Sequence, residues 1–228
     1  MSMPDTMVKI CGITSPEDAL AAVQAGADAI GLNFYAGPRR INISRGRAIA
    51  EAVGSHVQLI GLFAVSAWAA QRVPAAFLHA VQLYEAPADM PAPAVRWWRV
   101  VYATGLQQLR NVFAECCPAG GAQPAPQLPA ALLIDAHCPD AAGGTGKMVD
   151  WEMVALARQE LPRALSPPLL VLAGGLTPQN VAAGIRITGC RAVDVASGVE
   201  MAGHPGKKDR QRMEDFVAAA KAAFTQQA

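Results

Sequence analysis

The sequence predicts an α/β protein folded as a single, parallel, eight-stranded (β/α)8 barrel, and two observations indicate this class. Eight short aliphatic or β-branched runs alternate with Ala-rich amphipathic stretches along the whole chain, as in parallel sheets covered by helices. The runs are apolar throughout, as expected for strands buried on both faces. Eight such units in 228 residues fit a compact TIM barrel, and no composition shift marks a boundary. We therefore expect one domain over residues 1–228.

The predicted elements follow one another in strand–helix order. The strands are Val8–Cys11, Ala29–Phe34, Val57–Phe63, Ala80–Leu83, Trp97–Val101, Ala131–Asp135, Leu169–Ala173 and Ala192–Val195. The helices are Pro16–Ala25, Arg45–Val53, Ala67–Phe77, Gly105–Cys116, Trp151–Leu161, Pro178–Ile187 and Lys208–Phe224. Three prolines between Leu83 and Arg96 predict that the helix expected there is short or broken. The Pro- and Gly-rich stretch at 118–129 is predicted to be a loop far from the catalytic face.

Composition excludes several classes of protein. Hydrophobic residues make up 52% of the chain and charged residues 16%, which favours a large core over disorder. The 19 Lys and Arg nearly balance the 18 Asp and Glu, so we expect no nucleic-acid partner and no anionic membrane surface. Five cysteines without C-x-x-C spacing argue against a disulfide scaffold or zinc site and favour a reducing cytoplasm. No apolar run long enough for an export signal or a membrane span is present, so a cytoplasmic location is expected.

In a barrel of this class, the carboxyl ends of the strands and the loops after them form the catalytic face. Cys11 ends the first predicted strand; a lone cysteine after an aliphatic run is usually a small buried hydrophobe, but this one lies at the barrel mouth. Asp135 ends the otherwise apolar sixth strand. It is either a loop or capping carboxylate or, in an apolar pocket that raises its pKa, a general acid.

Two glycine-rich segments follow the seventh and eighth predicted strands: A-G-G-L-T-P-Q-N-V at 173–181 and D-V-A-S-G-V-E at 194–200. Either segment alone would be an ordinary turn. Together they stand where such barrels bind phosphate, through backbone N–H groups and the start of a short helix. The predicted phosphate-binding residues are Gly174, Gly175, Ala196, Ser197 and Gly198.

Two other loops have an ordinary and a functional interpretation. G-G-T-G-K at 143–147 is not a P-loop, because Ala141 and Met148 replace two required residues. It is either a flexible surface loop or a mobile lid over an anionic substrate. G-P-R-R at 37–40 is either a solvated basic loop or places Arg40 to bind a substrate carboxylate through a bidentate contact. We expect the adjacent Arg39 to point to solvent.

Together these segments resemble the phosphoribosylanthranilate isomerase family, from about Val8 to Asp209. The family's K-I-C-G-I/L-T strand matches residues 9–14, and its second strand with the arginine-containing loop matches 31–40. Its V-Q-L-H strand matches 81–84, and its G-G-T-G-K-x-F-D-W segment matches 143–151. Its L-A/S-G-G-L-x-P-x-N-V, D-x-S-S-G-V-E and P-G-x-K-D segments match 172–181, 194–200 and 205–209.

The resemblance implies an Amadori rearrangement of a phosphosugar, without a metal or other cofactor. It implies that Cys11 is the general base, Asp135 the general acid and Arg40 the group that binds the anthranilate carboxylate. It also adds Gln82 and Gly144 to the substrate-binding residues. Lys9, two residues before the cysteine on the same strand face, is a candidate for favouring the thiolate. A small-molecule phosphosugar is the expected partner, and the chain is expected to be a monomer or a weak homodimer.

The sequence departs from the family at Tyr84, where His is usual, at Ala196, where the family has Ser, in the loop at 36–38, and by the insert at 118–129. Three alternative functions predict different residues. The histidine-pathway aldose–ketose isomerase would carry Asp where Cys11 stands. Indole-glycerol-phosphate synthase would need a catalytic Lys at the end of the first strand and a longer N-terminal segment. A non-catalytic phospho-ligand-binding barrel would not need both Cys11 and Asp135.

Overall fold

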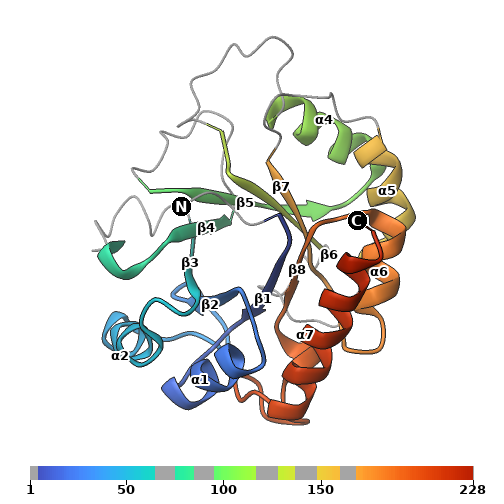
Figure 1. The fold of residues 1–228 in the computed structure, drawn as a ribbon. Helices are drawn as coiled ribbons and strands as arrows, with labels where there is room; N and C mark the ends of the chain where they lie inside the picture. The colour runs from blue at the N-terminus through green and yellow to red at the C-terminus, as the bar shows by residue number, and fades with distance from the viewer. Residues whose placement is uncertain are drawn as a thin grey trace.

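The computed structural model describes residues 5–64, 75–84, 95–116, 128–136, 148–159 and 168–227. Eight parallel strands close into a barrel in sequence order, and the last strand pairs with the first. Helices lie around the outside of the strands, as Figure 1 shows. The predicted fold class is therefore confirmed. In the described part of the chain, no helix is both long and apolar enough to cross a bilayer.

All eight predicted strands are present, with ends shifted by at most two residues. They are β1 Met7–Cys11, β2 Ala29–Asn33, β3 Gln58–Ala64, β4 Ala80–Tyr84, β5 Trp97–Ala103, β6 Ala131–Ala136, β7 Leu169–Leu172 and β8 Ala192–Val195. The helices are α1 Pro16–Gln24, α2 Ile43–Val53, α4 Leu106–Cys116, α5 Trp151–Gln159, α6 Val181–Thr188 and α7 Arg210–Thr225, with short 3-10 helices η1 Ala75–Phe77 and η3 Ser197–Val199. Most of the predicted helix at 67–77, the expected helix before Arg96 and most of the insert at 118–129 lie outside the described residues.

Side-chain caps set where several helices begin. The Ser15 hydroxyl accepts a hydrogen bond from the Asp18 N–H at 3.1 Å, immediately before α1. The Asn42 and Asp209 side chains cap α2 and α7 in the same way. Each cap satisfies a backbone donor that the first helical turn leaves without an intrahelical partner.

Alternating residues of the strands form two separate cores. One set packs between the strands and the outer helices. The other fills the barrel interior and includes Met7, Ile60, Trp98 and Leu133. Three buried polar side chains also point inward among these apolar groups: Lys9, Gln82 and Asp194. The barrel is a packed core with one polar layer, and the residues predicted to be catalytic lie at the mouth.

Candidate active site

Cys11 is the last residue of β1 and is only 6% exposed. It stands beside Gly31 of β2 in the strand register. A Cβ atom at Gly31 would lie 2.7 Å from the Cys11 Sγ and 3.1 Å from the Lys9 Nζ. The absence of a side chain at Gly31 therefore makes the space in which the thiol and the ammonium group sit close together.

A buried charge pair lies directly below the thiol. The Lys9 ammonium is fully buried and donates hydrogen bonds to Asp194 Oδ1 at 2.6 Å and to Gln82 Oε1 at 3.0 Å. It also lies 5.7 Å from the centre of the Trp98 ring, within the range of a cation–π contact. Gln82 in turn donates to the Tyr84 hydroxyl at 3.3 Å. Both ends of the Gln82 amide are thus engaged in the free protein, and direct contact of Gln82 with substrate stays a prediction.

The surroundings of Cys11 favour the thiol over the thiolate. Burial raises the pKa of Cys11, and the negative charge of Asp194 raises it further. Lys9 and Lys208 lower it, but they do not reverse the shift. Lys9 therefore acts in the predicted direction, and the carboxylate paired with it offsets much of its effect.

Asp135 is placed on β6, and its pKa is shifted in the direction that suits a general acid. Burial raises the pKa of this carboxyl to about 6, and the hydrogen bond from the Ala136 N–H, 2.8 Å long, limits the rise. Gly174 packs against it closely: a Cβ there would lie 3.0 Å from Asp135 Oδ1 and 2.7 Å from the Ala136 nitrogen. Asp135 therefore lies beside the first of the two predicted phosphate-binding loops.

The loops after β7 and β8 pack against each other through their backbones. Gly174 and Gly175 adopt φ values of 77° and 69°, a left-handed conformation that favours glycine. A Cβ at Gly198 would overlap the carbonyl oxygen of Leu176. Asn180 stabilises the loop after β7. Its side-chain amide donates to the Gly175 carbonyl at 2.9 Å and accepts from the Thr177 N–H at 2.7 Å. The structure thus brings the two predicted phosphate-binding segments together.

Three tyrosines from different elements gather at the mouth. The rings of Tyr35 and Tyr84 stack with centroids 5.3 Å apart, and Tyr102 lies 6.5 Å from Tyr84. Burial raises the pKa of Tyr84 well above its usual value, and the nearby groups Cys11 and Asp135 add to the rise. The hydroxyl of Tyr84 is therefore protonated at neutral pH, in a position close to both predicted catalytic groups.

The loop after β2 corrects one sequence-based expectation. Arg39 was expected to point to solvent, but its side chain is 11% exposed and packs over Gly12, next to Cys11. Its Nε and Nη2 donate to the two oxygens of Glu200 at 2.7 and 2.6 Å. Arg40, by contrast, is exposed. The turn at Gly37, with φ of 87°, and the bridge between Asn33 and Arg40 set this register.

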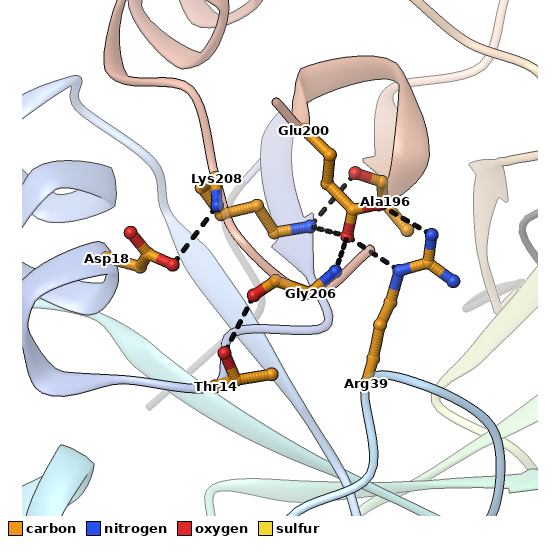
Figure 2. A network of polar contacts seen from close by, with 7 residues as sticks. All are labelled: Thr14, Asp18, Arg39, Ala196, Glu200, Gly206 and Lys208. Atoms are coloured by element: carbon orange, nitrogen blue, oxygen red, sulfur yellow. Dashed lines mark hydrogen bonds and ion pairs between the residues drawn. The ribbon is translucent and has the colours of Figure 1, made fainter. Parts of the chain in front are cut away.

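Sequence reasoning also missed the polar network around Glu200, shown in Figure 2. Glu200 accepts hydrogen bonds from Arg39, from the Lys208 ammonium at 3.1 Å and from the Gly206 N–H at 3.0 Å. The S-G-V-E and P-G-x-K-D segments carry the signal for this network, because they contain Glu200 and Lys208. Gly144 and the segment 143–147 lie outside the described residues.

Comparisons with known proteins identify the family of this chain. The family model described as N-(5'-phosphoribosyl)anthranilate (PRA) isomerase matches residues 99–219, more than half of the chain. A protein of Neisseria meningitidis serogroup C named N-(5'-phosphoribosyl)anthranilate isomerase is 38% identical over 220 residues, covering 93% of this chain and 95% of the relative.

Solved structures give the same result. The phosphoribosyl anthranilate isomerase of Thermotoga maritima superposes with a TM-score of 0.76 at 30% identity, covering 95% of this chain and 99% of that one. A second solved structure is that of a phosphoribosyl anthranilate isomerase in complex with reduced 1-(o-carboxyphenylamino)-1-deoxyribulose 5-phosphate. Its TM-score is 0.73 at 29% identity, and the match covers 95% of this chain and 99% of that one. The protein described here belongs to the N-(5'-phosphoribosyl)anthranilate isomerase family.

Proposed function

We propose that this protein converts N-(5'-phosphoribosyl)anthranilate to 1-(2-carboxyphenylamino)-1-deoxyribulose 5-phosphate, an Amadori rearrangement in tryptophan biosynthesis. One observation carries the proposal beyond family membership. A thiol on β1 and a carboxyl with a raised pKa on β6 occupy one barrel mouth, next to the paired glycine loops. The reaction needs a base, an acid and a binding site for the phosphate, and the barrel mouth contains a candidate for each.

The proposed reaction balances over one cycle when the proton that Cys11 gains returns through solvent to Asp135, which restores both groups. Asp135 gives its proton to the ring oxygen of the furanose, which opens the ring. Cys11, as thiolate, takes the proton from C2′, and the resulting enolamine then tautomerises to the ketose. The backbone around Gly174, Gly175, Ala196, Ser197 and Gly198 holds the 5′-phosphate, so that the reacting carbon lies between acid and base. No cofactor is required for this proton balance.

For the substrate carboxylate, we propose Arg39 in place of Arg40. A guanidinium presents two edges, each able to hold a carboxylate through two parallel hydrogen bonds. Glu200 occupies the edge formed by Nε and Nη2 of Arg39. Within the described ranges, Nη1 has no hydrogen-bond partner, so the second edge is open to a substrate carboxylate. Arg39 also lies over Gly12, next to the proposed base.

The assay that tests the function is the loss of phosphoribosylanthranilate fluorescence on addition of purified protein. Cys11→Ala and Asp135→Asn should each lower kcat at least ~100-fold, because each removes one partner in proton transfer. Both variants should keep the wild-type circular dichroism spectrum. Near-normal turnover in either variant would show that the assignment of that residue is wrong.

The neighbouring Arg40 provides a matched control for the assignment of Arg39. Arg39→Lys should lower kcat/KM by about 10- to 150-fold, the effect of losing a charge-assisted contact of roughly 1.5–3 kcal/mol. Arg40→Lys should change kcat/KM little, because this side chain is exposed. If Arg40→Lys is the damaging change, the carboxylate lies on the other side of the loop and Arg39 has only a structural role.

We also propose a cytoplasmic location, on the cysteine usage of the chain, and a monomer or weak homodimer. The three cysteines in the described ranges are free and buried, in keeping with a reducing compartment. The substrate is a small phosphosugar, and we propose no nucleic-acid partner.

A further inference from the structure

The carboxylate of Glu200 is the centre of a network that reaches both ends of the proposed substrate. Glu200 is 6% exposed and follows directly after the turn η3. Burial alone would raise its pKa, but Arg39 and Lys208 outweigh burial and hold the pKa of Glu200 below its usual value. The residue is therefore a buried anion at neutral pH, with two cationic partners (Figure 2).

Lys208 connects the same carboxylate to the phosphate side. Its ammonium group is buried and donates to Glu200 Oε1 at 3.1 Å and to the Ala196 carbonyl at 2.9 Å. Ala196 begins the turn whose N–H groups are proposed to bind phosphate. A fixed Ala196 carbonyl fixes the peptide plane that follows it, and that plane carries the Ser197 N–H.

The loops that carry these groups are also tied to the rest of the mouth. The Thr14 hydroxyl, after β1, donates to the Gly206 carbonyl at 2.7 Å. The Lys208 N–H donates to Asp18 of α1 at 3.1 Å. Through Glu200 and Lys208, the loops after β1, β2 and β8 therefore form one connected unit around the site (Figure 2).

We propose that Glu200 and Lys208 are positioning residues that couple the carboxylate-binding end of the site to the phosphate-binding end. Glu200 holds one edge of the Arg39 guanidinium and so aims the other edge at the substrate. Lys208 holds the Ala196 carbonyl and so fixes the turn at 196–198. The inference rests on the proposed role of Arg39 in binding the substrate carboxylate.

Two effects of Glu200 on Arg39 oppose each other. Its negative charge partly neutralises the guanidinium, which weakens the attraction for a substrate carboxylate. Its bidentate contact fixes a long side chain that would otherwise lose rotamer freedom on binding substrate. The coupling proposal requires that the second effect is the larger, because the open edge is useful only while it points into the site.

The test uses three variants of the full chain and three ligands. The variants are Glu200→Gln, Lys208→Met and Glu115→Gln; the last breaks the Arg99–Glu115 pair, 2.9 Å long, in which Glu115 is 48% exposed. The ligands are the natural substrate, an N-phosphoribosyl aniline that lacks the aromatic carboxylate, and inorganic phosphate as a competitive inhibitor.

Glu200→Gln should raise KM for the carboxylated substrate about 10-fold or more, the range for a lost charge-assisted contact. It should raise the phosphate inhibition constant and the KM of the aniline analogue by a smaller factor, about 3-fold, because Lys208 loses its counter-charge but keeps its bond to the Ala196 carbonyl. Lys208→Met should raise the phosphate inhibition constant and both KM values, since the turn serves every phosphorylated ligand. Glu115→Gln should change none of them. Adding Glu200→Gln to Arg39→Lys should have little further effect, because both changes remove one interaction.

Several results would overturn the coupling. A lower KM in Glu200→Gln would mean that Glu200 only competes with the substrate for Arg39. An equal loss on both substrates would mean a general structural role. If Arg39→Lys has a raised KM but Glu200→Gln does not, the positioning role of Glu200 is wrong while the role of Arg39 stands. If Arg39→Lys has a normal KM, the proposed role of Arg39 in binding the carboxylate is wrong. If Glu200→Gln does not unfold cooperatively, Glu200→Asp takes its place in the test. This variant keeps the negative charge beside Lys208, but its shorter side chain no longer reaches Arg39. That variant should still raise KM with an unchanged phosphate constant, and a normal KM in it would overturn the proposal.

Discussion

Cys11 and Asp135 share one apolar barrel, and burial raises the pKa of both. The consequence is an unfavourable resting charge state. At neutral pH the carboxyl, with its pKa of about 6, is mostly ionised, while the thiol is protonated. The reaction needs the reverse arrangement, a protonated Asp135 and a thiolate. Because burial raises the pKa of the thiol above its ordinary value, few molecules of the free protein carry that arrangement.

This charge state predicts the shape of the pH profile. Below about pH 6, most molecules carry a proton on both Asp135 and Cys11. Each further fall in pH makes the thiolate rarer, so kcat/KM should fall. From pH 6 upward the resting and productive states hold the same number of protons, so kcat/KM should stay level. It should fall again above the thiol pKa, which burial places above its ordinary value. The measurement is kcat/KM of the wild type and of the residual activity of Asp135→Asn. In that variant only the thiol titrates, so the level region should be lost and kcat/KM should rise with pH up to the thiol pKa. A level region that persists from pH 6 upward in Asp135→Asn would show that Asp135 is not the acid.

At the scale of the element, the loops after β7 and β8 depend on direct backbone packing. Gly198 has room for a hydrogen atom only, because a Cβ would overlap the Leu176 carbonyl. Any side chain at this position must push η3 away from the β7 loop. The two halves of the proposed phosphate site would then no longer face one anion.

Gly198→Ala should therefore weaken competitive inhibition by inorganic phosphate by about 5- to 150-fold, the range expected for overpacking of roughly 1–3 kcal/mol. Gly105→Ala is the matched control, since a Cβ at Gly105 meets nothing within 4 Å. Inhibition constants for both variants, measured in the isomerase assay, decide the matter. Unchanged phosphate inhibition in Gly198→Ala would place the phosphate elsewhere.

Elements built on burial were predictable from the sequence, and irregular loops were not. The strands were located because their runs are apolar on both faces, so composition alone marks them. The start of α6 was placed at Pro178 but lies at Val181, because residues 177–180 form a turn in which Asn180 binds back to Gly175 and Thr177. The choice between Arg39 and Arg40 depends on a left-handed turn at Gly37. A one-residue shift in such a loop reverses which side chain points inward, and local sequence carries no signal for it.

The pairing of Lys9 with Asp194 could have been inferred at the scale of the whole molecule. Lys9 alternates with Met7 and Cys11 on an apolar strand, which places it inside the barrel, where a charge needs a partner. The partner comes from β8, at the other end of the chain. This closure ties both ends of the sequence into one core, and we propose on that ground that residues 1–228 form a single domain.

Breaking this pair should destabilise the whole barrel. Asp194→Asn leaves the Lys9 ammonium buried without a counter-charge, and such changes reduce the free energy of unfolding by roughly 3–5 kcal/mol. Lys221→Gln removes an exposed pair with Asp28, 3.5 Å long, and should cost about 1 kcal/mol or less. Urea unfolding of both variants, followed by circular dichroism, gives the two values. Equal and small effects would show that the buried pair does not hold the barrel closed.

The Lys9–Asp194 contact also bears on how the protein is made. Its two residues are 185 positions apart, and ribosomes add about 5 to 20 residues each second. During synthesis, β1 therefore waits roughly 10 to 40 s with a lysine on its inner face before the counter-charge emerges. No partly synthesised chain can complete the barrel around that charge, so assembly of the catalytic mouth is postponed until nearly the whole polypeptide has left the ribosome.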